Sequence, residues 1–189
     1  AMAAAIDENR TLYMELQHRV KNTMNIITGI INIECDSLKG SPALRPLENI
    51  KNRVFTLSEL YSLLYASGNA KVVQLDRYLE NIVRSLDLTL VGNSGLRIST
   101  KCASIEAEVR VATSMGLILN ELLTNAFKHA FPAERGGVIT VRFREEPGRF
   151  LLRVSDDGVG LPPEFRVERS ETLGMQLVHN LTLQLRGTL

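Results

Sequence analysis

Apolar residues recur at helical spacing from about Asp7 to Leu38. Two positions of a heptad stay apolar, which is typical of a helix that packs along a neighbouring helix. These positions hold Tyr13, Val20 and Ile27, and then Leu16 and Ile30 with Thr23 between them. The pattern predicts a helix of about 30 residues and roughly 45 Å. The apolar stripe widens in the second half of this helix, at Met24, Ile26, Ile31 and Ile33. A stripe this broad usually faces more than one neighbour.

A second helical pattern follows the sequence KGSP at residues 39–42, which interrupts the first. Ser41 is a good helix cap, and Pro42 suits the first helical position. The apolar residues of this second pattern are Leu47, Ile50, Val54, Leu57, Leu60 or Tyr61, and Leu64. Two long helices joined by a short turn form an antiparallel hairpin. We therefore expect such a hairpin to occupy residues 1–68.

The pattern changes after the linker-like sequence ASGNAK at residues 66–71. Short alternating segments predict strands at VVQL, LRISTKCA, EAEVR, GVITVRFREE and RFLLRVSDD, the last two joined by a tight Pro147–Gly148 turn. Apolar periodicity predicts helices that begin near Leu75, at residues 111–130 and at about 173–185. Residues 69–189 are thus expected to form a second domain with helices on one face of a sheet, which makes the chain α+β. The terminal RGTL resembles the start of another strand, so we expect either that the domain is truncated at its C-terminus or that the sheet ends early.

Composition excludes several classes of protein. The chain has 189 residues with 22 basic and 21 acidic side chains, so no nucleic-acid or membrane partner is indicated by net charge. No apolar run approaches the roughly 18 residues of a membrane span, and no signal peptide is evident. Cys35 and Cys102 are far apart and lack metal-ligand spacing. These features favour a cytoplasmic protein.

The strand FLLRVSDDGVG at residues 150–160 carries the first candidate site. Alternation places Asp156 at the end of a row that should face the core, where an unpaired carboxylate needs a hydrogen-bond donor. Gly158 and Gly160 follow, and glycines allow a backbone to approach a flat ligand closely. The carboxylate could hold the exocyclic amine of adenine, whereas a turn-capping aspartate is the alternative.

The predicted helix with the sequence LILNELLTNAFKHAF, at residues 117–131, carries the second candidate site. Four polar residues of this helix are spaced by three or four positions and so should share one polar face: Glu121, Asn125, Lys128 and His129. An ordinary solvated face is the alternative reading. Asparagine is, however, unfavourable inside a helix. A carboxylate, an amide oxygen and a lysine together suit a magnesium triphosphate group.

The third candidate lies in SETLGMQLVHN at residues 170–180. Thr172 can cap the last helix, and Gly174 lies in its first turn, where free N–H groups and the helix dipole favour an anion. Met175 follows directly. The preceding polar stretch from Leu161 to Glu171 could close over a ligand as a lid.

These three stretches, in this order and spacing, resemble the ATP-binding domain shared by histidine kinases, gyrase, Hsp90 and MutL, in its histidine-kinase version. The resemblance spans about residues 72–189 and implies a Bergerat-type α/β sandwich that binds ATP without a Walker loop. It implies that Asn125 binds Mg²⁺ and that Glu121 orients or activates water or the nucleophile. Glu121 is also a second candidate for a metal ligand. It further implies that Asp156 contacts adenine and that Lys128 and His129 face the phosphates. Three glycines and a methionine complete the implied nucleotide site: Gly158, Gly160, Gly174 and Met175.

The helix at the N-terminus contains LQHRVKNTMNIITGII, which resembles the phosphoacceptor box of a histidine-kinase subgroup with His-Arg-x-x-Asn at its centre. The heptad places His18 opposite the apolar seam, with Glu15 and Asn22 on the same face. A ring nitrogen there can attack a γ-phosphate. Arg19 stands where commoner kinases have an acid, and it cannot act as a base, so Glu15 or Glu121 would have to orient the ring. Arg19 would instead steady phosphates or an acidic partner.

The resemblance implies a sensor histidine kinase core that autophosphorylates His18 from Mg-ATP and passes the phosphoryl group to an aspartate of a response-regulator receiver domain. It implies a homodimer through the hairpin, although a monomer whose hairpin covers its own ATP domain remains possible, and an upstream sensory domain that this chain lacks. A strict Trp-x-Glu subgroup is excluded because the chain has no tryptophan. The alternatives are a non-catalytic phosphotransfer scaffold, a serine kinase of the anti-sigma type, and a helical adaptor.

Overall fold

A computed structural model describes residues 2–67, 71–88, 95–132, 135–170 and 172–189. Contacts within the chain divide it into two units, Ala1–Ala70 and Lys71–Leu189. The first unit is helical and the second mixes helices with strands, as the alternation of patterns predicts. In the described residues, no helix combines the length and the apolar character that crossing a bilayer requires.

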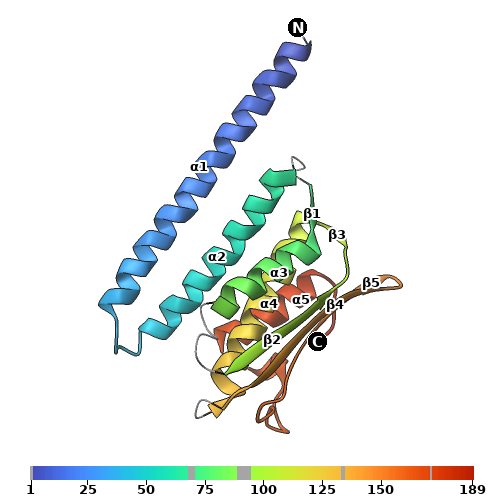
Figure 1. The fold of residues 1–189 in the computed structure, drawn as a ribbon. Helices are drawn as coiled ribbons and strands as arrows, with labels where there is room; N and C mark the ends of the chain where they lie inside the picture. Colours follow the sequence, from blue (N-terminus) through green and yellow to red (C-terminus); the bar gives the residue numbers. More distant parts are fainter. Residues whose placement is uncertain (1, 68–70, 89–94, 133–134, 171) are drawn as a thin grey trace. The chain divides into compact units, whose positions relative to one another are not determined.

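The N-terminal unit is an antiparallel helical hairpin of α1 (Met2–Ser37) and α2 (Leu44–Ser67) (Figure 1). Its described buried residues are Ile31 and Cys35 on α1, and Thr56 and Leu60 on α2. Much of the widened apolar stripe of α1 is nevertheless exposed; Ile33 is 70% exposed and Ile26 63%. The hairpin therefore buries only part of its apolar surface within one chain.

The connection between the two helices differs from the expectation. The Ser41 hydroxyl accepts a hydrogen bond from the backbone N–H of Ala43 at 3.2 Å, and the Ser41 carbonyl accepts one from Leu44 at 3.1 Å. Residues 41–43 therefore form a turn of their own after Gly40, whose φ of +84° suits glycine. The second helix begins at Leu44, so the prediction that Pro42 is its first residue is wrong by two positions.

The described residues of the C-terminal unit include five strands in two sheets. Strands β1 (Val72–Gln74) and β3 (Glu106–Glu108) pair antiparallel. The larger sheet has the order β2-β4-β5, formed by β2 (Leu96–Cys102), β4 (Gly137–Glu146) and β5 (Arg149–Asp156). Strands β2 and β4 are parallel and β4 and β5 form a hairpin. Parallel neighbours require a crossover, and α4 (Val109–His129) lies in the connection between β2 and β4.

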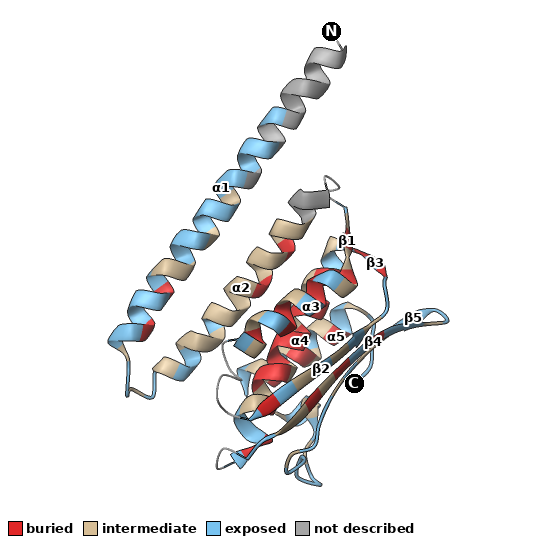
Figure 2. Ribbon diagram, viewed as in Figure 1, coloured by how far each residue is buried: buried red, intermediate tan, exposed pale blue. Residues whose placement is uncertain are grey.

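One face of the larger sheet packs against helices, where α3 (Leu75–Leu86), α4 and α5 (Leu173–Gln184) form a layer (Figure 1). Figure 2 shows the buried residues gathered between this layer and the strands. The largest fully buried apolar side chains are Leu75, Tyr78, Leu79, Ile82, Leu119, Leu123, Ile139, Val141, Phe143 and Val178. Their burial provides the main stabilisation of this unit.

Helix α4 approaches α3 closely at one glycine. A Cβ at Gly116 would lie within 2.6 Å of the Cζ of Tyr78, whose side chain is fully buried. Because Tyr78 is enclosed on all sides, its ring has no room to move aside. A glycine at this position therefore permits the packing of α4 on α3.

We expect Gly116→Ala to lower the free energy of unfolding. Overpacking against Tyr78 costs about 1–3 kcal/mol, which outweighs the gain of about 1 kcal/mol in helix propensity. Gly29→Ala is the matched control, because a Cβ at Gly29 in α1 would meet nothing within 4 Å. Thermal unfolding of both variants checks this, and a melting temperature of Gly116→Ala at or above that of the wild type would contradict it.

A second prediction concerns Cys102, a half-buried thiol at the end of β2. Burial, and then the negative charges of Glu80 and Asp76, raise the pKa of Cys102 from 9.0 to about 11. The folded state thus holds this proton more tightly than the unfolded state. Stability from this group is fully present below pH 9.0 and is lost as the pH rises towards about 11.

Unfolding of the wild type and of Cys102→Ala, compared at intervals between about pH 8 and 11, measures this contribution. We expect the wild type to lose more stability than the variant over this range. Parallel curves for the two proteins would show that the thiol does not titrate as described.

Candidate active site

A cavity of about 540 Å³ opens in the C-terminal unit between α4, the end of β5 and the segment that precedes α5. Its wall is mainly apolar with a few polar groups, as in small-molecule sites. The lining residues are Leu122, Asn125, Ala126, His129, Ala130, Val154, Asp156, Val159, Gly160, Leu161, Pro162, Phe165, Ser170, Thr172 and Met175. The structure thus gathers residues from the three stretches singled out in the sequence into one site.

Asn125 lies on the cavity side of α4 and is half-buried. Its amide Nδ2 donates a hydrogen bond to the sulfur of Met175 at 3.0 Å, which links α4 to the first turn of α5. A thioether is a weak acceptor. A bound ligand can therefore replace this contact at little cost, while Met175 itself stays buried in the wall.

Asp156 lines the cavity but is exposed, so the prediction of a core-facing, buried carboxylate is wrong. The predicted alternation is present, since Leu152 of the same row packs on the cluster formed by Ile118, Met175 and Val178. β5 is an edge strand, however, and its row passes from the half-buried Leu152 and Val154 to the exposed Asp156 at the end of the strand. The carboxylate accepts a hydrogen bond from Gly158 N–H at 3.1 Å, as a turn-capping aspartate does. Its position in the cavity wall is compatible with ligand binding as well.

The two glycines after this strand differ in their roles. A Cβ at Gly158 would lie 2.6 Å from the Cβ of Ala130 and closer still to the Ala130 carbonyl. The neighbouring Val159 N–H donates to that carbonyl at 2.9 Å. The close approach expected at Gly158 is therefore to the end of α4 and not to a ligand. Gly160 has a φ of +74° and open space around it, and it lines the cavity.

Asp157, which the sequence reasoning passed over, has a structural role. Its carboxylate accepts a hydrogen bond from Val138 N–H at 2.7 Å, and its own N–H donates to the Val138 carbonyl at 3.3 Å. These bonds continue the pairing of β4 and β5 by one residue beyond Asp156. The signal was present as the second aspartate of the Asp-Asp-Gly sequence, a residue type that often bonds to backbone at a turn.

The polar residues of α4 do not share one environment. Glu121 is only 4% exposed and does not line the cavity, although it lies one turn before Asn125. A Cβ at Gly174 would collide with its Oε2, so this carboxylate lies against the first turn of α5. His129 is exposed at the cavity, whereas Lys128 is exposed and lies outside its wall.

The start of α5 differs from the expectation in two respects. Thr172 occupies the N-cap position but makes no side-chain capping bond; its hydroxyl lies 3.1 Å from that of Ser170. The helix dipole at Gly174 faces the Glu121 carboxylate, which it stabilises. Gly174 is thus required by a buried carboxylate of the protein itself.

The segment predicted to act as a lid is anchored by apolar side chains. Phe165 and Val167 pack on the cluster of Ile118, Met175 and Val178 between α4 and α5. A short 3-10 helix, η3 (Val167–Arg169), follows Phe165. Glu171, the end of the predicted lid, lies outside the described residues.

The predicted acceptor residues lie in the N-terminal unit, on α1. His18 and Asn22 are exposed. Glu15, considered as a group that orients the imidazole, instead accepts hydrogen bonds from Arg19 Nη2 at 2.7 Å and Nε at 3.2 Å. The structure therefore shows Arg19 engaged with Glu15, one helical turn away on the face that carries His18.

Two family models match the chain. Residues 15–90 match the family described as "Histidine kinase", and residues 110–189 match "Histidine kinase-, DNA gyrase B-, and HSP90-like ATPase". The first match includes most of the N-terminal unit, and the second includes every residue that lines the cavity. The chain therefore belongs to the histidine kinases and is a sensor histidine kinase core with an ATP-binding domain.

Relatives and solved structures agree with this assignment. Blue-light-activated histidine kinase 2 of Erythrobacter litoralis is 30% identical over 88% of this chain and 49% of its own length. Sensor histidine kinase PdtaS of Mycobacterium tuberculosis is 29% identical over 98% of this chain and 37% of its own. The solved histidine kinase domain of Erythrobacter litoralis EL346 superposes with a TM-score of 0.69 at 28% identity, covering 95% of this chain and 86% of that one. The chain thus spans about half or less of the curated relatives it matches.

We expect Asp156→Asn to raise the Kd for ATP by about tenfold, because the acceptor loses its charge and a hydrogen bond to a charged group is worth about 1–1.5 kcal/mol more than a neutral one. Asp157→Asn is the matched control: it keeps an acceptor oxygen for Val138 N–H and lies outside the cavity wall. Isothermal titration with ATP measures both. Equal losses in the two variants would contradict the assignment of adenine recognition to Asp156.

Proposed function

We propose that this chain transfers the γ-phosphoryl group of Mg-ATP to His18 and that the group then passes to an aspartate of a response-regulator receiver domain. The observation that supports the first step most strongly is the cavity that joins Asn125, Asp156 and His129 in the ATPase-like unit. The exposed imidazole of His18 supports it independently. Two relatives named as histidine kinases align with 88% and 98% of this chain, which supports the same activity here.

In this reaction a ring nitrogen of His18 attacks the γ-phosphorus. A P–N bond forms, the bond from the γ-phosphorus to the β–γ bridging oxygen breaks, and ADP leaves with that oxygen. The other ring nitrogen then releases its proton. In the second step the aspartate carboxylate of the receiver attacks the same phosphorus, and the P–N bond breaks.

The proton acceptor is the least usual feature of this site. Arg19 follows His18 directly and cannot take a proton. Glu15 is held by Arg19 in the resting helix. We propose that incoming phosphate oxygens draw Arg19 away from Glu15, because a guanidinium binds phosphate as readily as carboxylate. Glu15 would then be released to orient the ring that lies one turn along the helix.

Mg²⁺ would be bound by the amide oxygen of Asn125, since oxygen ligands suit this cation and Asn125 lies in the cavity wall. When bound, the ion would neutralise charge on the β- and γ-phosphates. His129 would contact the phosphates from the end of α4, and Lys128 would reach them only from outside the wall. Glu121 would not be a metal ligand. It would instead position the first turn of α5, against which its carboxylate lies.

The exposed surface of the hairpin indicates a partner for this chain. We propose a homodimer through the hairpin, because Ile26, Ile30 and Ile33 remain exposed on α1 and together form an apolar stripe. The alternative, in which the hairpin covers surface of its own ATP domain, predicts a monomer by light scattering. Because the proposed reaction needs ATP and a receiver domain, we propose that it occurs in the cytoplasm. A sensory domain elsewhere in the natural protein would regulate it.

Incubation with γ-labelled ATP tests the proposed acceptor. We expect label that is lost in acid, persists in base, and falls to background in His18→Gln. The chain has three histidines, so His179→Gln on α5 is a matched control and should label normally. Label that persists in His18→Gln would overturn the proposal.

The same preparation distinguishes the phosphotransfer scaffold. A wild-type chain that binds no ATP, but whose His18 accepts a phosphoryl group from a phosphorylated receiver domain, would establish the scaffold instead. Retained ATP binding in His18→Gln separates a failed acceptor from a failed nucleotide site.

A further inference from the structure

The face of the β2-β4-β5 sheet opposite α3, α4 and α5 is rich in cations. The strand pairing assigns to it every residue that alternates with the buried row of Ile139, Val141 and Phe143. Its charged members are Arg97, Lys101, Arg142, Arg144, Arg149 and Arg153, with the single carboxylate Glu146. All six cations are exposed. We call this set the basic sheet face.

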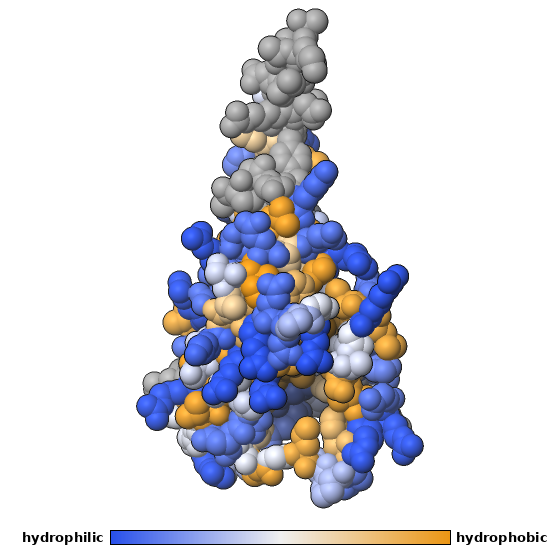
Figure 3. Space-filling view, turned by 90° about the vertical axis from the view of Figure 1, so that its right-hand side faces the viewer, coloured by the Kyte–Doolittle hydropathy of each residue, from blue (hydrophilic) through white to orange (hydrophobic). Residues whose placement is uncertain are grey.

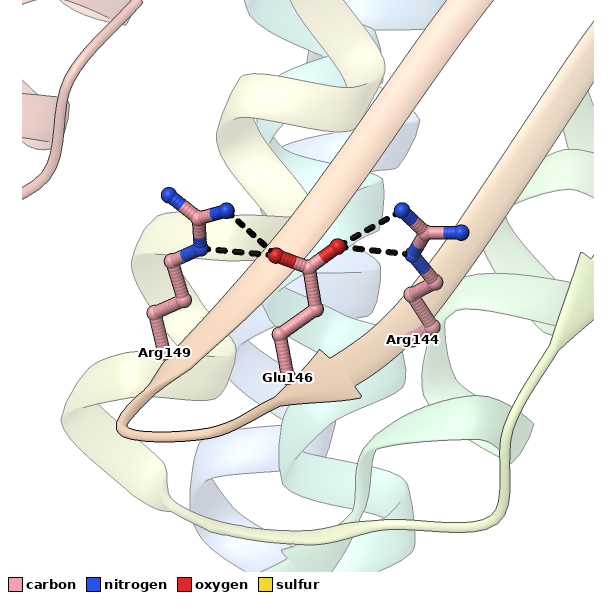
Figure 4. A network of polar contacts seen from close by, with 3 residues as sticks. All are labelled: Arg144, Glu146 and Arg149. Atoms are coloured by element: carbon pink, nitrogen blue, oxygen red, sulfur yellow. Dashed lines mark hydrogen bonds and ion pairs between the residues drawn. The ribbon is translucent and has the colours of Figure 1, made fainter.

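Glu146 compensates only the two arginines at the end of the β4–β5 hairpin (Figure 4). Its Oε1 accepts from Arg144 Nη2 at 2.6 Å and its Oε2 accepts from Arg149 Nε at 2.7 Å. The guanidiniums of Arg149 and Arg144 hold the pKa of Glu146 below its usual value. The carboxylate is therefore fully engaged and offers nothing to the remaining cations.

The remaining cations form a row across the sheet. Lys101 on β2 lies directly opposite Arg142 on β4, and Arg142 lies directly opposite Arg153 on β5. Directly opposite side chains have Cβ atoms about 4.5–5.5 Å apart, and like charges in such positions destabilise a sheet. In the described part of the chain, none of the three has an ion-pair partner. Such a row is unfavourable unless something outside the chain compensates it.

The row borders a small hollow. Arg142, Arg144 and Arg153 surround the half-buried Leu151, and the space between them is about 40 Å³. Figure 3 views the molecule from the side to which the β4–β5 hairpin projects, and hydrophilic side chains gather at the centre of that view. The hollow thus has the aliphatic side chain of Leu151 at its base and guanidinium groups around it.

We propose that the basic sheet face is a docking surface for a protein partner that presents carboxylates around an aliphatic side chain. Guanidiniums bind carboxylates through two parallel hydrogen bonds, and their alignment across three strands suits acidic residues at the spacing of adjacent strands. The aliphatic side chain of the partner would rest on Leu151.

Two features favour a protein over other polyanions. The face carries no aromatic side chain on which a nucleic-acid base could stack, since Phe150 belongs to the opposite row with Phe143. Its apolar side chains, Val138 and Leu151, are both half-buried, so they offer no exposed apolar group that could insert into a bilayer. The positive charge is also local, because the whole chain has a net charge of only +1. Such a local field steers one partner surface without attracting anions generally.

A fluorescein-labelled peptide of alternating glutamate and leucine is the probe, with anisotropy measured on the full chain. We expect the double variant Arg142→Gln and Arg153→Gln to bind it at least about tenfold more weakly than the wild type, since each lost guanidinium–carboxylate pair removes a charged hydrogen bond. Arg77→Gln with Arg84→Gln removes the same charge from exposed positions on α3 and is the matched control. It should bind the peptide within about twofold of the wild type because steering at a distance is screened by salt.

Thermal unfolding gives a second, independent result. The patch variant should melt at a temperature equal to or a few degrees above that of the wild type, because it loses like-charge repulsion between β4 and β5. Equal weakening of peptide binding in both double variants would overturn the proposal. So would failure of the wild type to bind the peptide. Tighter binding of duplex DNA or phosphatidylglycerol vesicles, lost in the patch variant, would overturn it in favour of a phosphate-bearing partner.

Discussion

The contact between Gly158 and Ala130 positions the polar groups that line the cavity. Because Gly158 has no Cβ, the loop after β5 can lie directly on Ala130, the residue that follows α4, where Val159 N–H bonds to the Ala130 carbonyl. This contact holds the end of β5 beside the end of α4. Asp156 and Asn125 therefore face one cavity although they come from different elements. A side chain at Gly158 would push these elements apart and separate the two polar groups.

Helix α4 divides its polar residues between two tasks. Glu121 is buried against the first turn of α5, where the helix dipole stabilises its charge. One turn later Asn125 reaches the cavity and bonds to Met175 in that same turn of α5. Both contacts link α4 to the start of α5, which follows directly on the segment predicted to act as a lid. A nucleotide that binds to Asn125 would thus change contacts at the start of α5, where the segment predicted to act as a lid joins this helix.

The surfaces of the two units are specialised in ways that the net charge conceals. Helix α1 carries an exposed apolar stripe together with the exposed His18, so the proposed association and the proposed phosphoryl acceptance would both use this helix. The basic sheet face concentrates cations on a chain with a net charge of +1. The two surfaces differ in chemistry, one apolar and one cationic, and so suit different partners.

Much of this fold could be predicted from the sequence. The helical hairpin, the five strands and the helices behind the larger sheet follow from periodicities of 3.6 and 2, which depend only on neighbours along the chain. The stretches that line the cavity were also recognisable, because residue types such as Asn125 in a helix or Asp156 before glycines are unusual without a use. The start of the second helix was misplaced because the turn around Ser41 depends on which backbone groups meet there.

Tertiary structure decided how each of these residues is used. It exposed Asp156 at the edge of the sheet, buried Glu121 under α5 and assigned Gly158 to the packing of a loop on α4. It also aligned Lys101, Arg142 and Arg153, which lie far apart in the sequence, in one row. The sequence by itself determined the elements and the chemical groups they carry, since periodicity is a local property. Burial and contact were decided only on folding, because they depend on residues from distant segments that the packing of the elements brings together.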